Sequence, residues 1–458
     1  MLKAIASLFS SKDMTVGSPW KKILSFSIPL LIGNIAQQTY NTVDSMIVGK
    51  YVGDNALAAV GTSMPLLNLL IVLFVGISTG VSIMVSQYYG AKKREELSMT
   101  IGNCISITAI ASLLLVLLAP FITEPLLGLL GVPDSIMAWS SAYLRIWLFG
   151  SFSFAYFNIL AGILRGMGDS FSPLLYLLIS ACINVGLDLY FVAQLNMGVA
   201  GAALATVISQ GFSALLSLYK LLHMRDVFDL QPKHLKISAS YFSRIARLGL
   251  PSGATQAIFS MAMLVVQSLI NGFGEFYIAA SLVVMRVDGF IMMPNMSFGL
   301  TMTTFTGQNI GAGKMDRVLE GEKQGLRLAL ATSLGLTLVI VLFGRNLMSL
   351  FSDTPELVDY GMRMLLLLTP GYVAMSVTQT LSGVMRGAGD TMTPMYVSII
   401  TAVVIRVTLA YGLVYLTQRP ETIFISLVSS WVAGGIINYL VFKKGRWKKK
   451  SILAADLN

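Results

Sequence analysis

The stretch Phe26–Val52, FSIPLLIGNIAQQTYNTVDSMIVGKYV, is long and apolar enough to cross a bilayer, yet it carries several polar side chains. A helix needs about 20 mostly apolar residues to span the hydrocarbon core. Four polar residues are spaced by 3, 4 and 3 positions, which places them along one face of an α-helix: Asn34, Gln37, Asn41 and Asp44. We expect the helix to turn this face away from lipid.

Asp44 is the charged member of this face. A charge at the bilayer centre costs about 2.5–3.5 kcal/mol on insertion scales, so Asp44 is expected to face a protein interior or a water-filled cavity. The alternative is that Asp44 lies near the outer end of the span and reaches the lipid headgroups, a position that needs no aligned amides. Pro29, fifteen residues earlier, removes a helical hydrogen bond and predicts a bend in the helix.

The composition is that of an integral membrane protein. The chain has 458 residues, of which 55% are hydrophobic and 12% charged, and its mean hydropathy is +0.74. Several runs are apolar over 20 or more residues and lack the period-2 alternation of barrel strands, so they are expected to be helices. We predict an all-α membrane protein with twelve transmembrane helices.

The net charge of +10 would also suit a nucleic-acid-binding protein, but the basic residues are distributed as in a membrane protein. Most Lys and Arg lie at the two termini and in alternate loops. The positive-inside rule then places both termini in the cytoplasm, which twelve spans satisfy because the number is even. We predict no nucleic-acid partner, and we expect contact with membrane lipid.

The second half of the chain repeats the first at a displacement of 221 or 222 residues. Residues 160–173, LAGILRGMGDSFSP, recur as residues 381–394, LSGVMRGAGDTMTP, and Pro29 recurs as Pro251. Each half therefore holds six spans, which predicts two pseudo-symmetric bundles in a parallel repeat, with the axis along the membrane normal. The predicted segments are a cytoplasmic N-terminus at 1–22, a first lobe at 23–222, a linker at 223–246, a second lobe at 247–443 and a basic tail at 444–458.

The repeated R-G-x-G-D segments are interpreted as helix connections. Their glycines can adopt left-handed conformations after a helix end, and Asp169 or Ser170 can cap the next helix, with Pro173 in its first turn. Neither segment fits a nucleotide-binding glycine pattern, so transport powered directly by ATP is not expected. The sequence predicts no cofactor.

Ionisable chemistry inside the membrane must come from carboxylates. Both histidines, His223 and His234, lie in the linker, and Cys104 and Cys182 are single residues of different spans, so no metal centre is predicted. The fifth and sixth spans each stack polar residues at helical spacing: Ser180, Asn184 and Asp188 in the fifth, and Thr206, Gln210 and Ser213 in the sixth.

Asp44 and Asp188 are predicted to meet if the first, fifth and sixth helices converge. Two neighbouring acids can take up a proton, and with the oxygens around them they suit sodium equally well. The repeat places apolar residues at the equivalent positions of the second half: Val265 or Val266, Ile405, Leu409 and Leu427. This asymmetry locates the ion chemistry in the first lobe.

The second half has charges of its own within its spans, namely Arg286, Asp288 and Arg406. We expect all three to be buried. Asp288 and Arg406 are expected to form an ion pair, because an unpaired buried charge is costly. A structural role is one interpretation of these residues, and contact with substrate or a part in gating is the other.

These motifs, taken in order, resemble the multidrug and toxic compound extrusion (MATE) family. The resemblance covers nearly the whole chain: VDSMIVG at 43–49, Gln-x-x-Gly-Ala-x-Lys at 87–93 and 308–314, the R-G-x-G-D segments, and NVGLD at 184–188 before GVAGAALAT at 198–206. It implies export of organic, often cationic or amphipathic compounds by alternating access, driven by protons or sodium ions. It also implies ion binding at Asp44, Asn184, Asp188 and Thr206, with Gln37 nearby, and we add Asn41 as its neighbour.

One branch of the family also uses acids on the seventh and tenth helices. This sequence has no Asp or Glu between Arg247 and Glu275, or between Asp359 and Asp390, so coupling through the first lobe is favoured. The expected protein is a monomer in the plasma (inner) membrane of a bacterium, with a small organic substrate. An exporter of metabolites or organic acids and a flippase for lipid-linked precursors are the alternatives, whereas no motif supports an enzyme.

Overall fold

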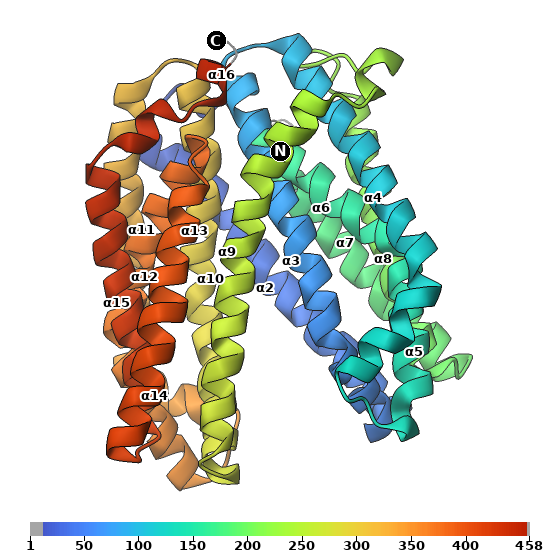
Figure 1. The fold of residues 1–458 in the computed structure, drawn as a ribbon, viewed down its shortest axis with the longest axis vertical. Coiled ribbons are helices and arrows are strands. Elements are labelled where there is room, and N and C mark those ends of the chain that lie inside the picture. The colour runs from blue at the N-terminus through green and yellow to red at the C-terminus, as the bar shows by residue number, and fades with distance from the viewer. Residues whose placement is uncertain (1–11, 456–458) are drawn as a thin grey trace, which may run out of the picture. The chain divides into compact units, whose positions relative to one another are not determined.

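The computed structural model describes residues 12–455, which form helices joined by short turns and by one longer linker after α8 (Figure 1). The helices of the first half are α2 (Pro19–Tyr51), α3 (Asp54–Gly90), α4 (Arg94–Leu129), α5 (Asp134–Phe149), α6 (Ser151–Gly166), α7 (Phe171–Asp188) and α8 (Gly198–Leu222). Those of the second half are α9 (Ala239–Asn271), α10 (Glu275–Gly311), α11 (Met315–Ser349), α12 (Pro355–Gly387), α13 (Met392–Ser398), α14 (Arg406–Thr417), α15 (Glu421–Lys443) and the short α16 (Ile452–Ala455).

Twelve spans follow from these helices. Ten are long and apolar enough to cross a membrane, and α5 with α6, bent by 48° at Gly150, makes an eleventh. Two of the ten contain a π-helical turn, Leu189–Gln194 after α7 and Ile399–Ile405 between α13 and α14. The twelfth is α2, a helix of 33 residues that is long enough to cross a membrane but, with its polar row, is not among the candidate spans by composition. The fold is therefore the predicted all-α membrane architecture.

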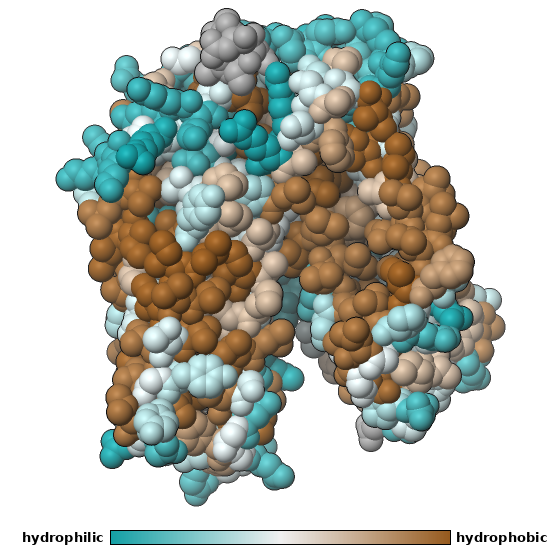
Figure 2. All heavy atoms as spheres, in the orientation of Figure 1, coloured by the Kyte–Doolittle hydropathy of each residue, from teal (hydrophilic) through white to brown (hydrophobic). Residues whose placement is uncertain are grey.

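Hydrophobic side chains cover the middle of the helices on the outside of the protein. Figure 2 shows hydrophobic surface along the helices and hydrophilic surface at their ends. Helix α4 exposes Leu113, Leu114 and Leu117, and α11 exposes Leu338 and Leu342. Exposed leucines in such numbers are expected where helices face lipid rather than water.

The helices form two compact units, and the division falls inside the first helix of each half. One unit contains Lys12 and Ile32–Gly253, and the other contains Asp13–Leu31 together with the chain from Ala254 onward. Helix α2 thus passes from the second unit to the first two residues after Pro29, and α9 passes in the opposite direction two residues after Pro251. The sequence-based lobe limits, 23–222 and 247–443, follow helix ends and stay a prediction.

The repeated R-G-x-G-D segments cap helices in both halves. Asp169 Oδ1 accepts hydrogen bonds from the backbone N–H groups of Phe171 (3.1 Å) and Ser172 (2.9 Å), at the start of α7. In the same way Asp390 accepts from the Thr393 N–H at 3.2 Å and from the Thr393 hydroxyl at 2.8 Å. Asp169 is therefore the capping residue, as predicted.

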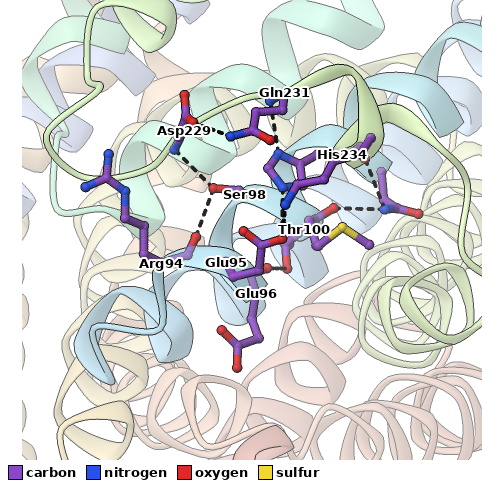
Figure 3. A network of polar contacts seen from close by, with 11 residues as sticks. Arg94, Glu95, Glu96, Ser98, Thr100, Asp229, Gln231 and His234 are labelled. Carbon is purple, nitrogen blue, oxygen red and sulfur yellow. Dashed lines mark hydrogen bonds and ion pairs between the residues drawn. The ribbon is translucent and has the colours of Figure 1, made fainter.

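The linker after α8 is fastened to the first turns of α4 (Figure 3). Gln231 N–H donates to Nδ1 of the buried His234 at 3.0 Å, so the proton of a neutral ring lies on Nε2, which donates to Glu95 Oε1 at 3.1 Å. Asn103 of α4 accepts the Ser238 N–H at 2.8 Å, and the Ser98 hydroxyl accepts the Asp229 N–H at 3.1 Å. These bonds hold the linker as an ordered part of the first unit.

Replacing His234 with alanine is expected to loosen the linker. The change leaves the Gln231 N–H without its acceptor and removes the contact with Glu95, for a cost of about 1–3 kcal/mol. The rate of proteolytic cleavage within residues 223–238 should rise, and the melting temperature of the purified protein should fall. His223→Ala is the control, because His223 is exposed and its ring bonds, among the described residues, only the Tyr219 carbonyl in the last turn of α8. Equal cleavage of the two variants would contradict the expectation.

Candidate functional site

The candidate site lies where α2, α7 and α8 meet inside the first unit. Asp44 of α2, Asn184 and Asp188 of α7 and Thr206 of α8 are all buried, with exposed fractions of 9%, 0%, 0% and 7%. Helical spacing explains the arrangement within α7, because Asn184 and Asp188 are one turn apart and present both side chains to α2 and α8. The structure thus brings four of the predicted residues together.

The two carboxyl groups of this cluster contact each other. Asp44 and Asp188 lie within hydrogen-bonding reach of one another. Two carboxylates can share such a contact only if a proton or a cation lies between them, because two bare negative charges at this distance repel strongly in a medium of low dielectric constant. The arrangement is therefore suited to binding a small positive ion.

Thr206 links the three helices through its hydroxyl. Its Oγ1 accepts hydrogen bonds from the Tyr40 hydroxyl of α2 at 3.4 Å and from Asn184 Nδ2 of α7 at 3.5 Å. The Thr206 hydroxyl itself donates to the Ala202 carbonyl, one turn earlier in α8, at 3.0 Å. Because Asn184 gives its N–H to Thr206, its carbonyl oxygen remains available for another partner.

Several oxygens of this region have no hydrogen-bond donor among the residues that the structure describes. They are Asp44 Oδ1, both carboxylate oxygens of Asp188, Asn184 Oδ1, Gln210 Oε1 and Ser180 Oγ. Buried polar atoms are normally satisfied, so a set of unsatisfied oxygens indicates a missing donor or cation. Within residues 12–455 no group of three or more His, Cys, Asp or Glu side chains could hold a metal ion, so any cation here would need neutral oxygens beside the two acids.

Tyr40 and Tyr143 belong to the site but were not predicted from the sequence. Tyr40 precedes Asp44 by one turn of α2, and it is buried. Tyr143 of α5 is also buried and lies close enough to interact electrostatically with Asp44 and Asp188. The spacing of Tyr40 and Asp44, one turn apart on the polar side of the helix, is the signal that could have identified Tyr40. Nothing in the spacing points to Tyr143, which comes from another helix.

Gln37 and Asn41 lie outside the cluster. Gln37 Nε2 donates to Asn41 Oδ1 at 3.2 Å, and Asn41 is exposed. At 100° per residue, Asn41 lies about 60° around the helix from Asp44, which is enough to separate the two side chains. The structure therefore divides the predicted polar face, with Tyr40 and Asp44 turned inward and this amide pair at its edge.

The second half, as far as residue 455, has no equivalent acid cluster. Val266 and Leu427, at the positions equivalent to Asp44 and Thr206, are buried in an apolar core with residues of α10, α12 and α15. The helices of the second unit that correspond to α2 and α8 thus contribute hydrophobic packing at these positions. The polar cluster lies in the first unit.

The charges of the second half are arranged differently from the prediction. Arg406 is buried as expected, but no ion pair within 4.0 Å joins it to Asp288 in the described part of the chain. Arg406 Nε donates to Ser430 Oγ at 3.0 Å and its guanidinium lies 5.8 Å from the centre of the Phe259 ring. Asp288 was also expected to be buried, but its side chain is only half-buried. It faces the Tyr372 hydroxyl and lies close enough to Arg406 for electrostatic attraction.

Arg286 was expected to be buried, and this prediction is wrong. The residue is exposed, and its guanidinium lies 6.0 Å from the centre of the Phe351 ring, beyond the end of α11. Residues two positions apart on an α-helix differ in direction by about 200°. Arg286 therefore points outward because Asp288 points inward.

Pro29 lies within α2, which continues through it without interruption. The bend predicted at this residue stays a prediction. Its place in the fold is nevertheless informative, because the chain passes between the two compact units two residues later.

Comparison with known proteins gives one family for both halves of the chain. The MatE family model matches residues 29–190 and again residues 251–412, once in each half. These matches agree with the sequence repeat, in which Pro29 corresponds to Pro251.

Relatives of known sequence and solved structures match this chain along nearly its full length. The probable multidrug resistance protein YoeA of Bacillus subtilis is 29% identical over 449 residues, covering 95% of this chain and 96% of that protein. The probable multidrug resistance protein NorM of Thermotoga maritima is 23% identical, covering 95% of each. A crystal structure of MATE in the bent conformation has a TM-score of 0.89 at 26% identity, covering 96% of this chain and 98% of that one.

Proposed function

Because this chain belongs to the MATE family of membrane transporters, we propose that it is a secondary active antiporter that exports organic, cationic or amphipathic compounds in exchange for protons or sodium ions. The observation that carries the ion coupling is the contact between the Asp44 and Asp188 carboxyl groups. The names of the relatives support the class of substrate, since both are named probable multidrug resistance proteins.

The coupling ion occupies the cluster of Asp44, Asp188, Asn184 and Thr206. A proton would sit between the two carboxyl groups, whereas a sodium ion would also need neutral oxygens, and Asn184 Oδ1 is unsatisfied. In either case the bound ion removes the repulsion between the acids. Release of the ion restores a negative site in the first unit, which favours entry of the next cationic substrate.

Transport follows from a change in α2. Asp44 and Pro29 lie on the same helix, and that helix passes from one compact unit to the other just after the proline. Ion binding at Asp44 changes how the following segment of α2 packs on α7 and α8, and a helix lacking one hydrogen bond at Pro29 can bend to follow. Uptake of the ion from outside thereby drives expulsion of the substrate, and release of the ion inside resets the cycle. Gln37 and Asn41, at the edge of the cluster, are placed to contact the ion or the substrate during this movement.

An exporter of metabolites or organic acids is the alternative of the same architecture. It would require arginines free to bind an anionic substrate. Arg406 contacts Ser430 and Phe259, and Arg286 is exposed on α10, so neither of these two arginines is placed to bind an anionic substrate. The acidic cluster of the first unit supports a cationic substrate instead. A flippase for lipid-linked precursors would need a basic cleft, whereas the buried cluster of the first unit is acidic.

We place the transporter in the plasma (inner) membrane as a monomer with both termini in the cytoplasm. The relatives named above are bacterial, and the basic residues at the termini support this orientation. The core of the proposed ion site is formed within one chain.

The test is efflux of a cationic dye from proteoliposomes under an imposed pH gradient or an imposed sodium gradient. We expect uphill dye movement with one of these gradients and none in liposomes without protein. Movement driven by both would indicate that either ion occupies the acid pair. A fluorescent carboxylate serves as the second arm, and transport of the carboxylate alone would overturn the proposal in favour of an organic-acid exporter.

A further inference from the structure

The second unit contains a polar cavity that the proposed transport cycle does not use. A small cavity of about 20 Å³ lies between α9, α12, the α13 segment and α15. Its lining includes the polar residues Thr378, Gln379, Ser382, Ser398, Thr401 and Asn438. No lining residue is acidic, whereas one of them, Arg386 of α12, carries a positive charge.

Among the residues that the structure describes, Arg386 has no counterion. Its Nε is buried and donates to no acceptor in the described part of the chain, and no carboxylate there pairs with its guanidinium. Asp390, the acid that follows it in sequence, is engaged with Thr393 as a helix cap. A buried charge without a partner is costly, so this guanidinium is expected to have a partner of opposite charge.

A second atom in the same cavity is also unsatisfied. The Thr378 hydroxyl, one turn of α12 from Ser382, has no hydrogen-bond partner among the described residues. An unsatisfied N–H and an unsatisfied O–H that line one cavity both require an acceptor. The acid cluster of the first unit differs, because its unsatisfied atoms are oxygens of Asp44, Asp188 and Asn184 that can accept a hydrogen bond or bind a cation.

The repeat shows why the guanidinium lacks a partner in the second half only. Arg165, the equivalent of Arg386, donates from Nη2 to Ser78 Oγ at 3.3 Å. The residue equivalent to Ser78 is Gly299, which has no side chain to offer. A Cβ built on Gly299 would lie 3.4 Å from Nη2 of Arg386, so a serine there would reach the guanidinium.

The residues that line the cavity also differ from their equivalents in the first half. In the first unit, Phe157, Leu177 and Ala214 form a small hydrophobic cluster with aromatic neighbours. Displacement by 221 residues converts Phe157 to Thr378 and Leu177 to Ser398, both of which line the cavity. Two apolar side chains are thus replaced by smaller hydroxylated ones. They lie near Arg386, which has a glycine where Arg165 has Ser78.

We propose that this cavity binds a small monovalent anion, with chloride as the physiological occupant, between the Arg386 guanidinium and the Thr378 hydroxyl. The bound anion supplies the missing acceptor for both groups and neutralises the buried charge. The inference does not depend on the transport cycle, because the site is built from residues of the second unit and the acid cluster from residues of the first. Its role is to stabilise the packing of α12 against α13 and α15.

The test measures the melting temperature of the purified full-length protein while chloride replaces gluconate at constant ionic strength. A ligand that binds only the folded state raises this temperature, and we expect a saturable rise of about 2–5 °C. Line broadening of the chloride-35 NMR signal by the protein gives a second readout of binding. Absence of both effects in the wild-type protein overturns the proposal.

Two variants and one control assign the effect to the cavity. Arg386→Met and Gly299→Ser should both lose the chloride-dependent rise and the line broadening. Gly299→Ser supplies the hydroxyl that Ser78 supplies in the first unit, and its new Cβ would meet the Gln379 carbonyl oxygen at 3.2 Å, which a shift of a few tenths of an ångström relieves. Its melting temperature in gluconate should therefore equal or exceed that of the wild type.

Arg165→Met is the matched control, because Arg165 occupies the equivalent position and already has the Ser78 hydroxyl as a partner. It should keep the full response to chloride. A response that persists in both Arg386→Met and Gly299→Ser would overturn the proposal even if chloride stabilises the wild type, since the anion would then bind elsewhere.

Discussion

Cells that express the Asp44→Asn or the Asp188→Asn variant are expected to accumulate a cationic dye as fast as cells without the transporter. Asparagine keeps the size of the side chain, but it can neither take up a proton nor contribute negative charge to a sodium site. Each substitution removes one member of the carboxyl pair that is proposed to hold the coupling ion. The measurement is initial dye efflux at equal expression, repeated in proteoliposomes with the gradient that drives the wild type.

The effects of the Asp44→Asn and Asp188→Asn substitutions on efflux should not be additive. The carboxyl groups contact each other, and residues that share one ligand act as a unit, so the double variant should be no less active than either single variant. Thermal stability should be kept or improved, because the change removes charge from a buried site rather than leaving a charge unpaired. Loss of efflux with unchanged stability is the combination that identifies a coupling role.

Glu124→Gln is the matched control for this experiment. Glu124 belongs to the same unit but is exposed, and it pairs with Arg145 at 2.6 Å on the surface. Exposed ion pairs contribute about 0–1 kcal/mol, so this variant should transport like the wild type. Undiminished efflux in both aspartate variants would refute the assignment of the ion site.

The sequence was sufficient to place Asp44 and Asp188 on helix faces, because a 3.6-residue period fixes direction around a helix. It could not place Tyr143, because contact between α5 and the acid pair depends on tertiary packing. It also grouped Asn41 with Asp44, although the two differ by about 60° in direction, a distinction that matters only once the neighbouring helices are known. Arg286 was misjudged because membership of a span was taken to imply burial.

The repeat predicted the helix caps and the apolar residues that replace the acids, because these depend on local sequence. The place where the chain divides between two units could not be predicted in this way. Helix α9 is continuous in sequence and in hydrogen bonding, yet its residues up to Gly253 belong with the first unit and those from Ala254 with the second. Only contacts with distant helices decide that division.

One of those contacts is a close crossing of α3 and α9 inside the first unit. Gly76 and Gly80 of α3 are one turn apart and face Gly253 and Gly249 of α9, which have the same spacing. A Cβ on Gly76 would lie 2.5 Å from the Gly253 Cα, and a Cβ on Gly80 would lie 2.6 Å from the Gly249 backbone nitrogen. Small residues at this spacing allow membrane helices to approach at backbone distance, so the packing of these segments depends on the absence of side chains.

Gly76→Ala and Gly80→Ala are therefore expected to destabilise the protein strongly. The added methyl group meets backbone rather than a flexible side chain, so the helices must separate, and overpacking of this kind costs about 1–3 kcal/mol or more.

Gly61→Ala provides the control on the same helix, because no atom lies within 4 Å of a Cβ built there. That variant should be neutral or more stable by about 0.5–1 kcal/mol, since alanine is the better helix former. The order of the melting temperatures of the purified variants decides the matter. If Gly76→Ala and Gly80→Ala melt with or above Gly61→Ala, the close crossing of α3 and α9 is wrong.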